Sequence, residues 1–321
     1  MEYRTLGKTG LSVSHLCFGV LTIGPLQANL PLAEGVALLE YAASQGVNFF
    51  DTAEDYRTYP YLRSLLRKVK DKPLIIASKS YAVTAQEMSA SLDRARKEMD
   101  RDYIDIFLLH EQESALTLQG HHQALEFLIE AREKGIVRAV GLSTHTVAGA
   151  RAVLDKPEID VVHPLFNIRG LGILVGSREA MLDAIKSAWG QGKGVYLMKA
   201  LGGGHLLHQA EQALSYAFGQ ECATSVAVGM QTRAEIDCNV ALACGMPVTE
   251  RLRAATARPG ALGARRLHIE DCCEGCGQCA EICPQGALSL GADGRIHVVE
   301  SSCLLCGYCA GVCPYFCIKV Y

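Results

Sequence analysis

Residues 47–56 read VNFFDTAEDY, an apolar run of strand length that ends at a carboxylate, Asp51, and is followed five residues later by a phenol, Tyr56. Similar apolar, β-rich runs recur through residues 1–244 and alternate with amphipathic helical stretches. Strands that are apolar along their whole length are typical of a parallel sheet covered by helices. The runs lie at residues 15–20, 47–53, 74–79, 103–110, 139–145, 161–167, 194–200 and 225–230.

Eight such runs, each followed by a helical stretch, predict an α/β fold of the (β/α)8 TIM barrel type. An open, doubly wound parallel sheet remains the alternative. Residues 3–5 and 11–13 flank the turn Gly7-Lys-Thr-Gly10, so we expect a short hairpin that closes the bottom of the barrel. We predict a barrel domain over residues 1–244, a linker over 245–270 and a smaller domain over 271–321.

Four polar side chains stand where a barrel places its chemistry, at the C-terminal ends of strands. Asp51 follows the second run, Lys79 ends the third, His110 ends the fourth, and Tyr56 lies in the loop after the second. A strand-end Asp is often a helix cap, and a lone His is often a buried core group. All four at successive strand ends are much less expected by chance, so we interpret them as a candidate catalytic set.

These residues resemble the motifs of the aldo-keto reductase superfamily over residues 1–244. Asp51-Thr-Ala-Glu-Asp-Tyr56 looks like the family's D-T-A-x-x-Y, and Lys79 and His110 stand where the family has a strand-three Lys and a strand-four His. The resemblance implies carbonyl or alcohol redox chemistry on a small-molecule substrate. It implies that Tyr56 protonates a carbonyl oxygen during hydride transfer and that His110 orients this carbonyl. Lys79, paired with Asp51, would lower the pKa of the phenol by favouring its anion.

The resemblance also implies a nicotinamide cofactor, NADP or NAD, although this chain departs from the family's pattern at several positions. Met198 stands where a Tyr commonly stacks on the nicotinamide, and Glu235 stands at a place that is often Gln or Arg. A carboxylate there does not favour a 2′-phosphate, so NADP is not preferred over NAD, and a flavin is left open. By position, the residues expected at the nucleotide are Gly19, Ser143, Thr144, His163, Asn167, Met198, Gly202, Gly203, Gly229, Met230, Gln231, Arg233 and Asn239.

Eight of the fourteen cysteines form two copies of the spacing C-x2-C-x2-C-x3-C-P. This is the run of a bacterial ferredoxin with two 4Fe-4S clusters, in which the fourth Cys of each run ligates the other cluster. We therefore expect an α+β, ferredoxin-like domain, which makes this chain a ferredoxin-fused branch of the family it resembles. The first cluster is assigned to Cys273, Cys276, Cys279 and Cys313, and the second to Cys303, Cys306, Cys309 and Cys283.

Zinc sites and a disulfide framework are the alternatives for these cysteines. C-x2-C pairs also build zinc sites, but zinc gives no reason for the third Cys or for the Pro of each run. Disulfides would need an oxidising compartment, and the N-terminus lacks the apolar region of a signal peptide. Among the remaining cysteines, Cys272 adjoins Cys273 and could compete as a ligand. Residues 287–290 and 296–299 flank Ala292-Asp-Gly294, which predicts a hairpin in this domain.

Net charge and the lengths of the apolar stretches limit which partners we expect for this protein. The net charge is −3 without a large basic excess, so nucleic acid is not an expected partner. No apolar stretch approaches the ~20 residues that a membrane span needs, and we expect a cytoplasmic protein.

The two parts pose a question of coupling, because a nicotinamide moves two electrons as a hydride and each cluster moves one. We favour a redox enzyme in which the clusters exchange electrons with the barrel site. A carbonyl reductase with structural clusters and an electron-transfer module for a partner protein are the alternatives. The linker is long enough to return to the catalytic face, so we predict that the cluster domain sits over or beside the barrel mouth.

Overall fold

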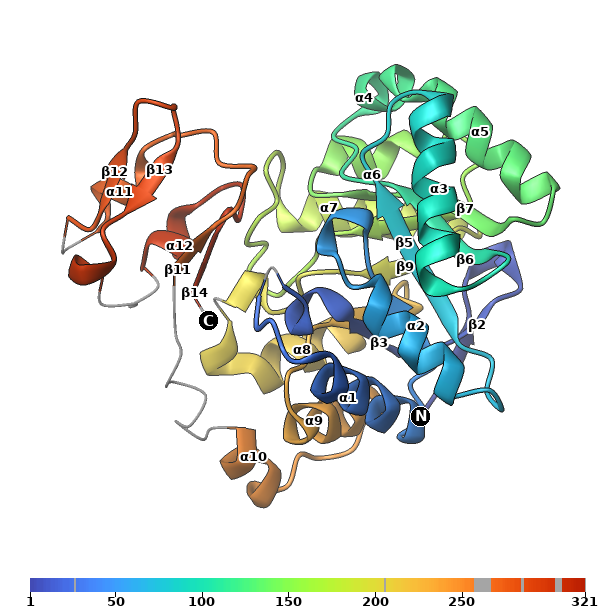
Figure 1. The fold of residues 1–321 in the computed structure, drawn as a ribbon, viewed down its shortest axis with the longest axis horizontal. Helices are drawn as coiled ribbons and strands as arrows, with labels where there is room; N and C mark the ends of the chain where they lie inside the picture. The colour runs from blue at the N-terminus through green and yellow to red at the C-terminus, as the bar shows by residue number, and fades with distance from the viewer. Residues whose placement is uncertain (26, 205, 257–266, 284–285, 304–307, 321) are drawn as a thin grey trace.

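The computed structural model of the protein describes residues 1–25, 27–204, 206–256, 267–283, 286–303 and 308–320. Its first part is a closed barrel of parallel strands in the order β10-β3-β4-β5-β6-β7-β8-β9 (Figure 1). The predicted (β/α)8 barrel is therefore confirmed, and the open sheet is excluded. The barrel strands are β3 (Leu16–Gly19), β4 (Phe49–Asp51), β5 (Ile75–Ser80), β6 (Ile104–Leu109), β7 (Val137–Thr144), β8 (Val161–Pro164), β9 (Gly194–Leu197) and β10 (Ser225–Val228).

Helices surround the barrel, and capping side chains mark where several of them begin. Thr84 accepts a hydrogen bond from the Glu87 N–H while the Glu87 carboxylate accepts one from the Thr84 N–H, a capping box that starts α3. The described helices of this part are α1 (Leu32–Ser44), α2 (Tyr59–Lys68), α3 (Ala85–Met99), α4 (Ala115–Gly120), α5 (His122–Glu133), α6 (Val147–Ala152), α7 (Arg178–Gly190), α8 (Ala210–Phe218), α9 (Arg233–Ala243) and α10 (Glu250–Thr256).

The N-terminal hairpin closes the bottom of the barrel, as predicted. Strands β1 (Tyr3–Thr5) and β2 (Ser12–Ser14) pair antiparallel, so the second strand lies one residue later than expected. Leu6, Leu11 and Val13 are buried in one cluster with barrel-interior side chains such as Phe49 and Ile106. The barrel is thus filled from below, and its other end is left for chemistry.

The second part is a small α+β domain with its own core. Its elements are β11 (Leu267–Ile269), α11 (Gln278–Glu281), β12 (Leu288–Leu290), β13 (Ile296–Val298), α12 (Tyr308–Val312) and β14 (Ile318–Val320). Strands β12 and β13 form the predicted hairpin, and β11 pairs antiparallel with β14. Cys279, Leu288, Ile296 and Ile318 are among the side chains buried in its core. Figure 1 shows this domain as a separate lobe beside the barrel.

The stretch between the two parts contains α10, whose Arg253 forms an ion pair with Glu211 of α8. Arg258, Arg265 and Arg266, which the sequence places in the predicted linker, lie outside the described residues.

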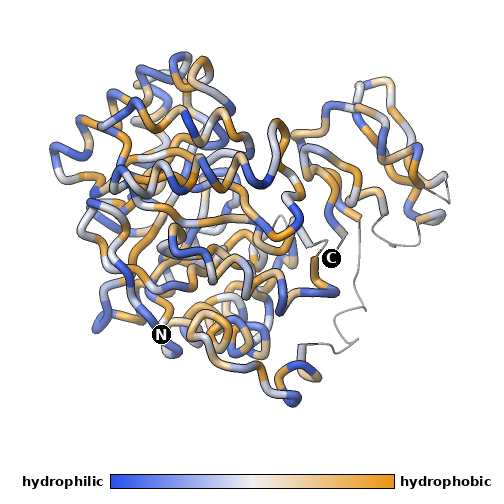
Figure 2. Tube along the Cα trace, turned by 180° about the vertical axis from the view of Figure 1, so that it is seen from behind, coloured by the Kyte–Doolittle hydropathy of each residue, from blue (hydrophilic) through white to orange (hydrophobic). Residues whose placement is uncertain are grey.

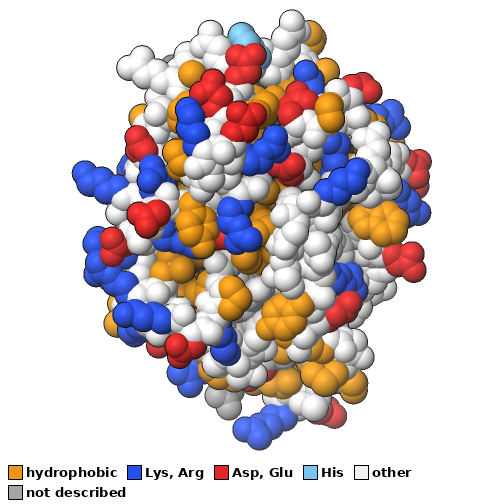
Figure 3. Space-filling view, turned by 90° about the vertical axis from the view of Figure 1, so that its right-hand side faces the viewer, with side chains coloured by type: hydrophobic (Ala, Val, Ile, Leu, Met, Phe, Trp, Pro, Cys, Tyr) orange, Lys and Arg blue, Asp and Glu red, His pale blue; other side chains and the backbone are white. Residues whose placement is uncertain are grey.

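Apolar and charged side chains differ in where they lie in the barrel. Apolar segments run through the barrel interior (Figure 2). The face turned away from the small domain intersperses Lys and Arg with Asp and Glu and shows no field of a single sign (Figure 3). In the part of the chain that the structure describes, no helix has the length and apolarity required to cross a membrane.

Candidate active site

Asp51 and Lys79 form a buried ion pair at the C-terminal ends of the neighbouring strands β4 and β5. The Lys79 ammonium donates to both carboxylate oxygens and to the Thr52 carbonyl, each at 2.7 Å. Tyr196, from β9, donates its hydroxyl to the other face of the carboxylate at 2.9 Å. The ammonium has three hydrogens, and each has an acceptor, which is the condition for keeping a charge out of water.

Tyr56 and His110 lie directly beside this pair. Tyr56 is in a short turn after β4, and Lys79 Nζ lies 5.2 Å from the centre of its ring. The His110 ring meets the Tyr56 ring edge-on, with their centres 5.9 Å apart. The structure therefore brings together all four side chains that the sequence selected as the candidate catalytic set.

The expected effect on the phenol is wrong in sign. Burial raises the pKa of Tyr56 well above its ordinary value, and the carboxylates of Asp51, Glu111 and Glu270 raise it further. The sequence argument took the ammonium of the Asp51–Lys79 pair as the charge that acts on the phenol, but burial and then the Asp51 carboxylate are the largest causes, and both raise the pKa. Tyr56 is consequently a phenol that keeps its proton at neutral pH.

His110 is buried and neutral. Burial lowers its pKa to about 3, despite the neighbouring Glu111 carboxylate, which acts in the opposite direction. Tyr81 stacks on the imidazole, with ring centres 4.2 Å apart. His110 Nδ1 is buried and has no hydrogen-bond partner among the described residues.

Glu111, His145 and Lys199 are mouth residues that the sequence argument missed. Glu111 Oε1 lies 3.5 Å from His145 Nε2. Burial by itself raises the pKa of Glu111, but the charges of His145, His110 and Lys199 lower it to about 2. Burial also lowers the pKa of His145 to about 4 and that of Lys199 below its ordinary value. Glu111 lies two residues after the end of β6 and Lys199 two residues after the end of β9, so a search slightly beyond each strand end would have found them.

Backbone strain concentrates at this mouth. Arg57, Glu111, Lys199 and Phe316 all adopt positive φ, at 57°, 51°, 57° and 54°. Side chains other than glycine rarely adopt this conformation, and it persists only where the surrounding structure enforces it. Strain at such positions is typical of functional sites.

The residues predicted to bind a nucleotide are largely engaged in holding their own loops. Ser143 accepts the N–H of Glu111 at 2.9 Å, and Thr144 accepts that of Thr146 at 3.1 Å. Asn167 donates to the carbonyls of Leu171 and Lys199 and accepts two backbone N–H groups of its own loop. The remaining predicted positions are placed as follows: His163 stacks on Tyr196, Arg233 lies over the Tyr41 ring, Met198 pairs with Leu165, Gly19 lies against Gly229, Met230 and Asn239 are buried, and Gln231 donates to Thr22.

The N-terminus of α9, a natural anion site, is filled by the protein itself. The Glu235 carboxylate accepts the N–H groups of Gln231 and Thr232 at 2.6 and 3.3 Å. Thr232 completes the capping box by accepting the Glu235 N–H. A phosphate that binds these amides would have to displace a carboxylate of the chain.

The small domain is seated on the barrel mouth, which confirms the predicted placement. Phe316 is buried, its ring lies 5.2 Å from Lys199 Nζ, and its centre lies 6.5 Å from that of His145. A side chain at Gly172 or Gly203 would collide with this ring, since an added Cβ would lie 1.7 or 2.8 Å from it. Gly202 and Gly203, expected to face phosphates, thus belong to a loop that receives Phe316 instead.

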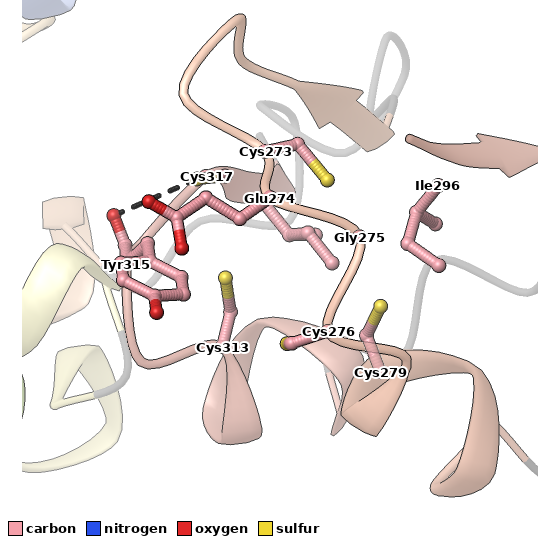
Figure 4. Close-up of a pocket in the computed structure, with 10 residues that line it drawn as sticks. Cys273, Glu274, Gly275, Cys276, Cys279, Ile296, Cys313, Tyr315 and Cys317 are labelled. Atoms are coloured by element: carbon pink, nitrogen blue, oxygen red, sulfur yellow. Dashed lines mark hydrogen bonds between the residues drawn. The ribbon is translucent and has the colours of Figure 1, made fainter. Parts of the chain in front are cut away.

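The thiols assigned to the first cluster line one pocket. Cys273, Cys276, Cys279 and Cys313 surround it together with Cys317, and several of their sulfurs point into it (Figure 4). Gly275 and Gly277, at φ of 64° and 82°, provide the tight turn between these cysteines. Four thiols around one space fit a cubane cluster, whereas no three His, Cys, Asp or Glu side chains of the described residues converge as a single metal ion requires.

The second set is described in part. Cys283 accepts the N–H of Ala287 at 3.4 Å, an orientation that suits a thiolate ligand. Cys309 is buried in the core of the small domain, and Cys303 is half-buried. Cys306 lies outside the described residues.

Comparison with known proteins matches both parts of the chain. The Aldo/keto reductase family profile matches residues 15–209, and the 4Fe-4S dicluster domain profile matches residues 272–317. L-galactose dehydrogenase of Arabidopsis thaliana is 23% identical over 282 residues, which cover 75% of this chain and 88% of that protein.

Solved structures agree. A protein of Pseudomonas aeruginosa assigned to the aldo-keto reductases is 27% identical, with a TM-score of 0.65 over 76% of this chain and 95% of that one. An aldo-keto reductase of Bacillus halodurans, at 18% identity and a TM-score of 0.63, covers 80% of this chain and 95% of its own, and supports the fold alone. The chain belongs to the aldo/keto reductase family, and its C-terminal part is a 4Fe-4S dicluster domain.

Proposed function

We propose that the protein couples carbonyl or alcohol redox chemistry at the barrel mouth to electron transfer through two 4Fe-4S clusters. The seating of the small domain carries this proposal, because Phe316 lies against Lys199 and His145 beside the candidate catalytic set. The Glu270 carboxylate, at the start of the small domain, even contributes to the electrostatic surroundings of Tyr56. A purely structural cluster domain would have no reason to cover the catalytic face.

In this proposal Tyr56 is the acid that protonates a carbonyl oxygen. Its raised pKa keeps the proton on the phenol at neutral pH, which is the protonation state that a general acid needs. His110, as a neutral imidazole with an unpartnered nitrogen, orients the same oxygen by a hydrogen bond. The buried Asp51–Lys79 pair lies beside the phenol, with Lys79 Nζ 5.2 Å from the centre of the Tyr56 ring.

The nicotinamide and the clusters would supply electrons in different ways. When bound, a nicotinamide would supply a hydride and the clusters would supply single electrons. Glu235 at the start of α9 favours NAD over NADP, since it already occupies the amides that a 2′-phosphate would approach. We place the protein in the cytoplasm, where the thiols that ligate clusters stay reduced.

The proposal is tested on anaerobically purified protein. We expect iron and sulfide for two clusters, and bleaching of their visible absorption when NADH is added, with NADPH less effective. Bleaching by neither nucleotide, with no flavin released on denaturation, would contradict the coupling. Nucleotide-dependent ketone reduction that survives Cys276→Ala at full rate in a folded protein would instead assign the clusters a structural role.

Removal of the Tyr56 hydroxyl should abolish proton donation without disturbing the fold. We expect Tyr56→Phe to lower kcat for carbonyl reduction by about 10²–10⁴-fold, the usual contribution of a positioned acid. Tyr41→Phe is the matched control, because its hydroxyl bonds Asp237 away from the mouth. Steady-state kinetics measure the effect, and equal rates for both variants would reject Tyr56 as the acid.

The buried neutral histidines make the free energy of unfolding depend on pH. His110 and His145 have folded pKa values of about 3 and about 4, below the unfolded value of about 6.5. At pH values between the folded and unfolded pKa of each histidine, the unfolded chain binds more protons than the folded chain. Stability is therefore retained above about pH 6.5 and lost as pH falls. At pH 5 we expect each histidine to account for up to about 2 kcal/mol of the loss.

Urea unfolding at pH 7 and pH 5 measures this loss. His110→Gln combined with His145→Gln should reduce the dependence and leave the part due to His15 and His163, whose pKa values burial also lowers. His122→Gln, on an exposed helix end, should leave the dependence unchanged. An undiminished slope in the double variant would contradict the assignment.

The Phe316 contact offers a test of domain seating. Gly172→Ala places a methyl group on the ring and adds a side chain at φ of 85°, so the small domain should be displaced. We expect cluster reduction by the nucleotide to slow by about 10–100-fold, the range for a misplacement of about 1 Å. Gly190→Ala, whose Cβ meets open space, is the control. Stopped-flow absorbance measures both rates, and equal rates would show that this seating is not needed.

A further inference from the structure

Cys272 and Cys317 lie together although neither belongs to the two cysteine runs. Their sulfurs are 2.7 Å apart, and both are free cysteines. The fold itself brings them together, since β11 and β14 pair antiparallel and the Glu270 N–H donates to the Cys317 carbonyl at 2.7 Å. Proximity therefore follows from backbone pairing, not only from the choice of side-chain rotamers.

The pair stands between the two redox parts of the molecule. On one side, Cys317 lines the same pocket as Cys273 and Cys313, and Cys272 precedes Cys273 in the chain (Figure 4). On the other side, Cys272 is close enough to Glu111 and Lys199 at the barrel mouth to interact with their charges. Cys317 is 1% exposed, whereas Cys272 is exposed, so one sulfur is protected and the other can be reached from solvent.

We propose that Cys272 and Cys317 are a redox-active pair that interconverts between a disulfide and two thiols. Reduction breaks the S–S bond and forms two S–H bonds, taking up two electrons and two protons; oxidation reverses both. The electrons come singly from iron–sulfur donors of the small domain, and the protons come from solvent at exposed Cys272. The pair thus stores two electrons between one-electron donors and a two-electron site. This role rests on the clusters of the proposed function but not on the barrel's substrate.

The first test reads the thiols directly in the intact protein. One anaerobic sample is kept oxidised and a second is reduced with dithionite, and both are quenched in acid with a chelator. Free thiols are then alkylated with one isotopic form of a reagent, and thiols released by a later reducing step are alkylated with the other form. Fragment mass spectrometry then assigns each label. We expect Cys272 and Cys317 to be protected together in the oxidised sample and labelled at least tenfold more after dithionite. Cysteines labelled equally in both states would overturn the proposal.

The second test counts electrons. The wild type should take up two more electrons per chain than Cys317→Ser or Cys272→Ser in a coulometric titration, with iron and sulfide content unchanged in both variants. Cys244→Ser is the control, because this partly exposed thiol lies at the end of α9, and it should match the wild type. Equal uptake in all proteins would overturn the proposal. Loss of iron from Cys272→Ser would also overturn it, by making Cys272 a cluster ligand. If Cys317→Ser fails to fold, the thiol labelling of the wild type still decides.

Discussion

The site depends on the ion pair between Asp51 and Lys79. Each charge is nearly fully buried, and removing an ion from water costs several kcal/mol even after the protein relaxes. The pair is tolerable only because the barrel supplies the missing partners, the Thr52 carbonyl from β4's end and the Tyr196 hydroxyl from β9. Closure of the barrel is what brings Tyr196 to a carboxylate 145 residues away. The electrostatics of the mouth are therefore a product of the whole barrel and not of one motif.

The small domain alters the surroundings in which the Asp51–Lys79 pair acts on Tyr56. Without a cover, a phenol beside an ammonium would be open to water. With the domain seated, burial and a ring of carboxylates raise the Tyr56 pKa instead. The small domain, seated on the mouth, also helps to explain the backbone strain at Glu111, Lys199 and Phe316. Each positive φ costs of order 1–3 kcal/mol and persists only where the surrounding structure enforces it. The barrel and the small domain, which contact each other at the mouth, thus determine its chemistry jointly.

The sequence was sufficient for features set by local pattern. Apolar runs predicted the barrel strands, and Ala292-Asp-Gly294 predicted the β12–β13 hairpin. It was insufficient where two distant segments meet. The glycine run Gly202–Gly204 does not distinguish a neighbouring Phe316 ring from a bound phosphate. A ring and a phosphate both need a close approach to the backbone, which glycines allow because they have no side chain. The predicted sign of the Tyr56 pKa shift was wrong because the sequence shows neither the burial of the phenol nor the nearness of the Asp51, Glu111 and Glu270 carboxylates.

The division between one-electron and two-electron chemistry falls where the small domain contacts the barrel mouth. The interior of the barrel holds the Asp51–Lys79 pair and mostly apolar side chains, with the thiol of Cys17 and the phenol of Tyr196 among them. The first cysteine pocket lies on the far side of the Cys272–Cys317 contact. Tyr81, Glu111, Lys199 and Phe316 are among the groups that lie at the mouth between them. Cys272 and Cys317 add a pair of sulfurs to this contact, and two thiols and a disulfide interconvert by reversible uptake of two electrons. A chain that joins a hydride-type barrel to one-electron centres therefore has its means of pairing electrons at the contact surface, where neither part alone would reveal it.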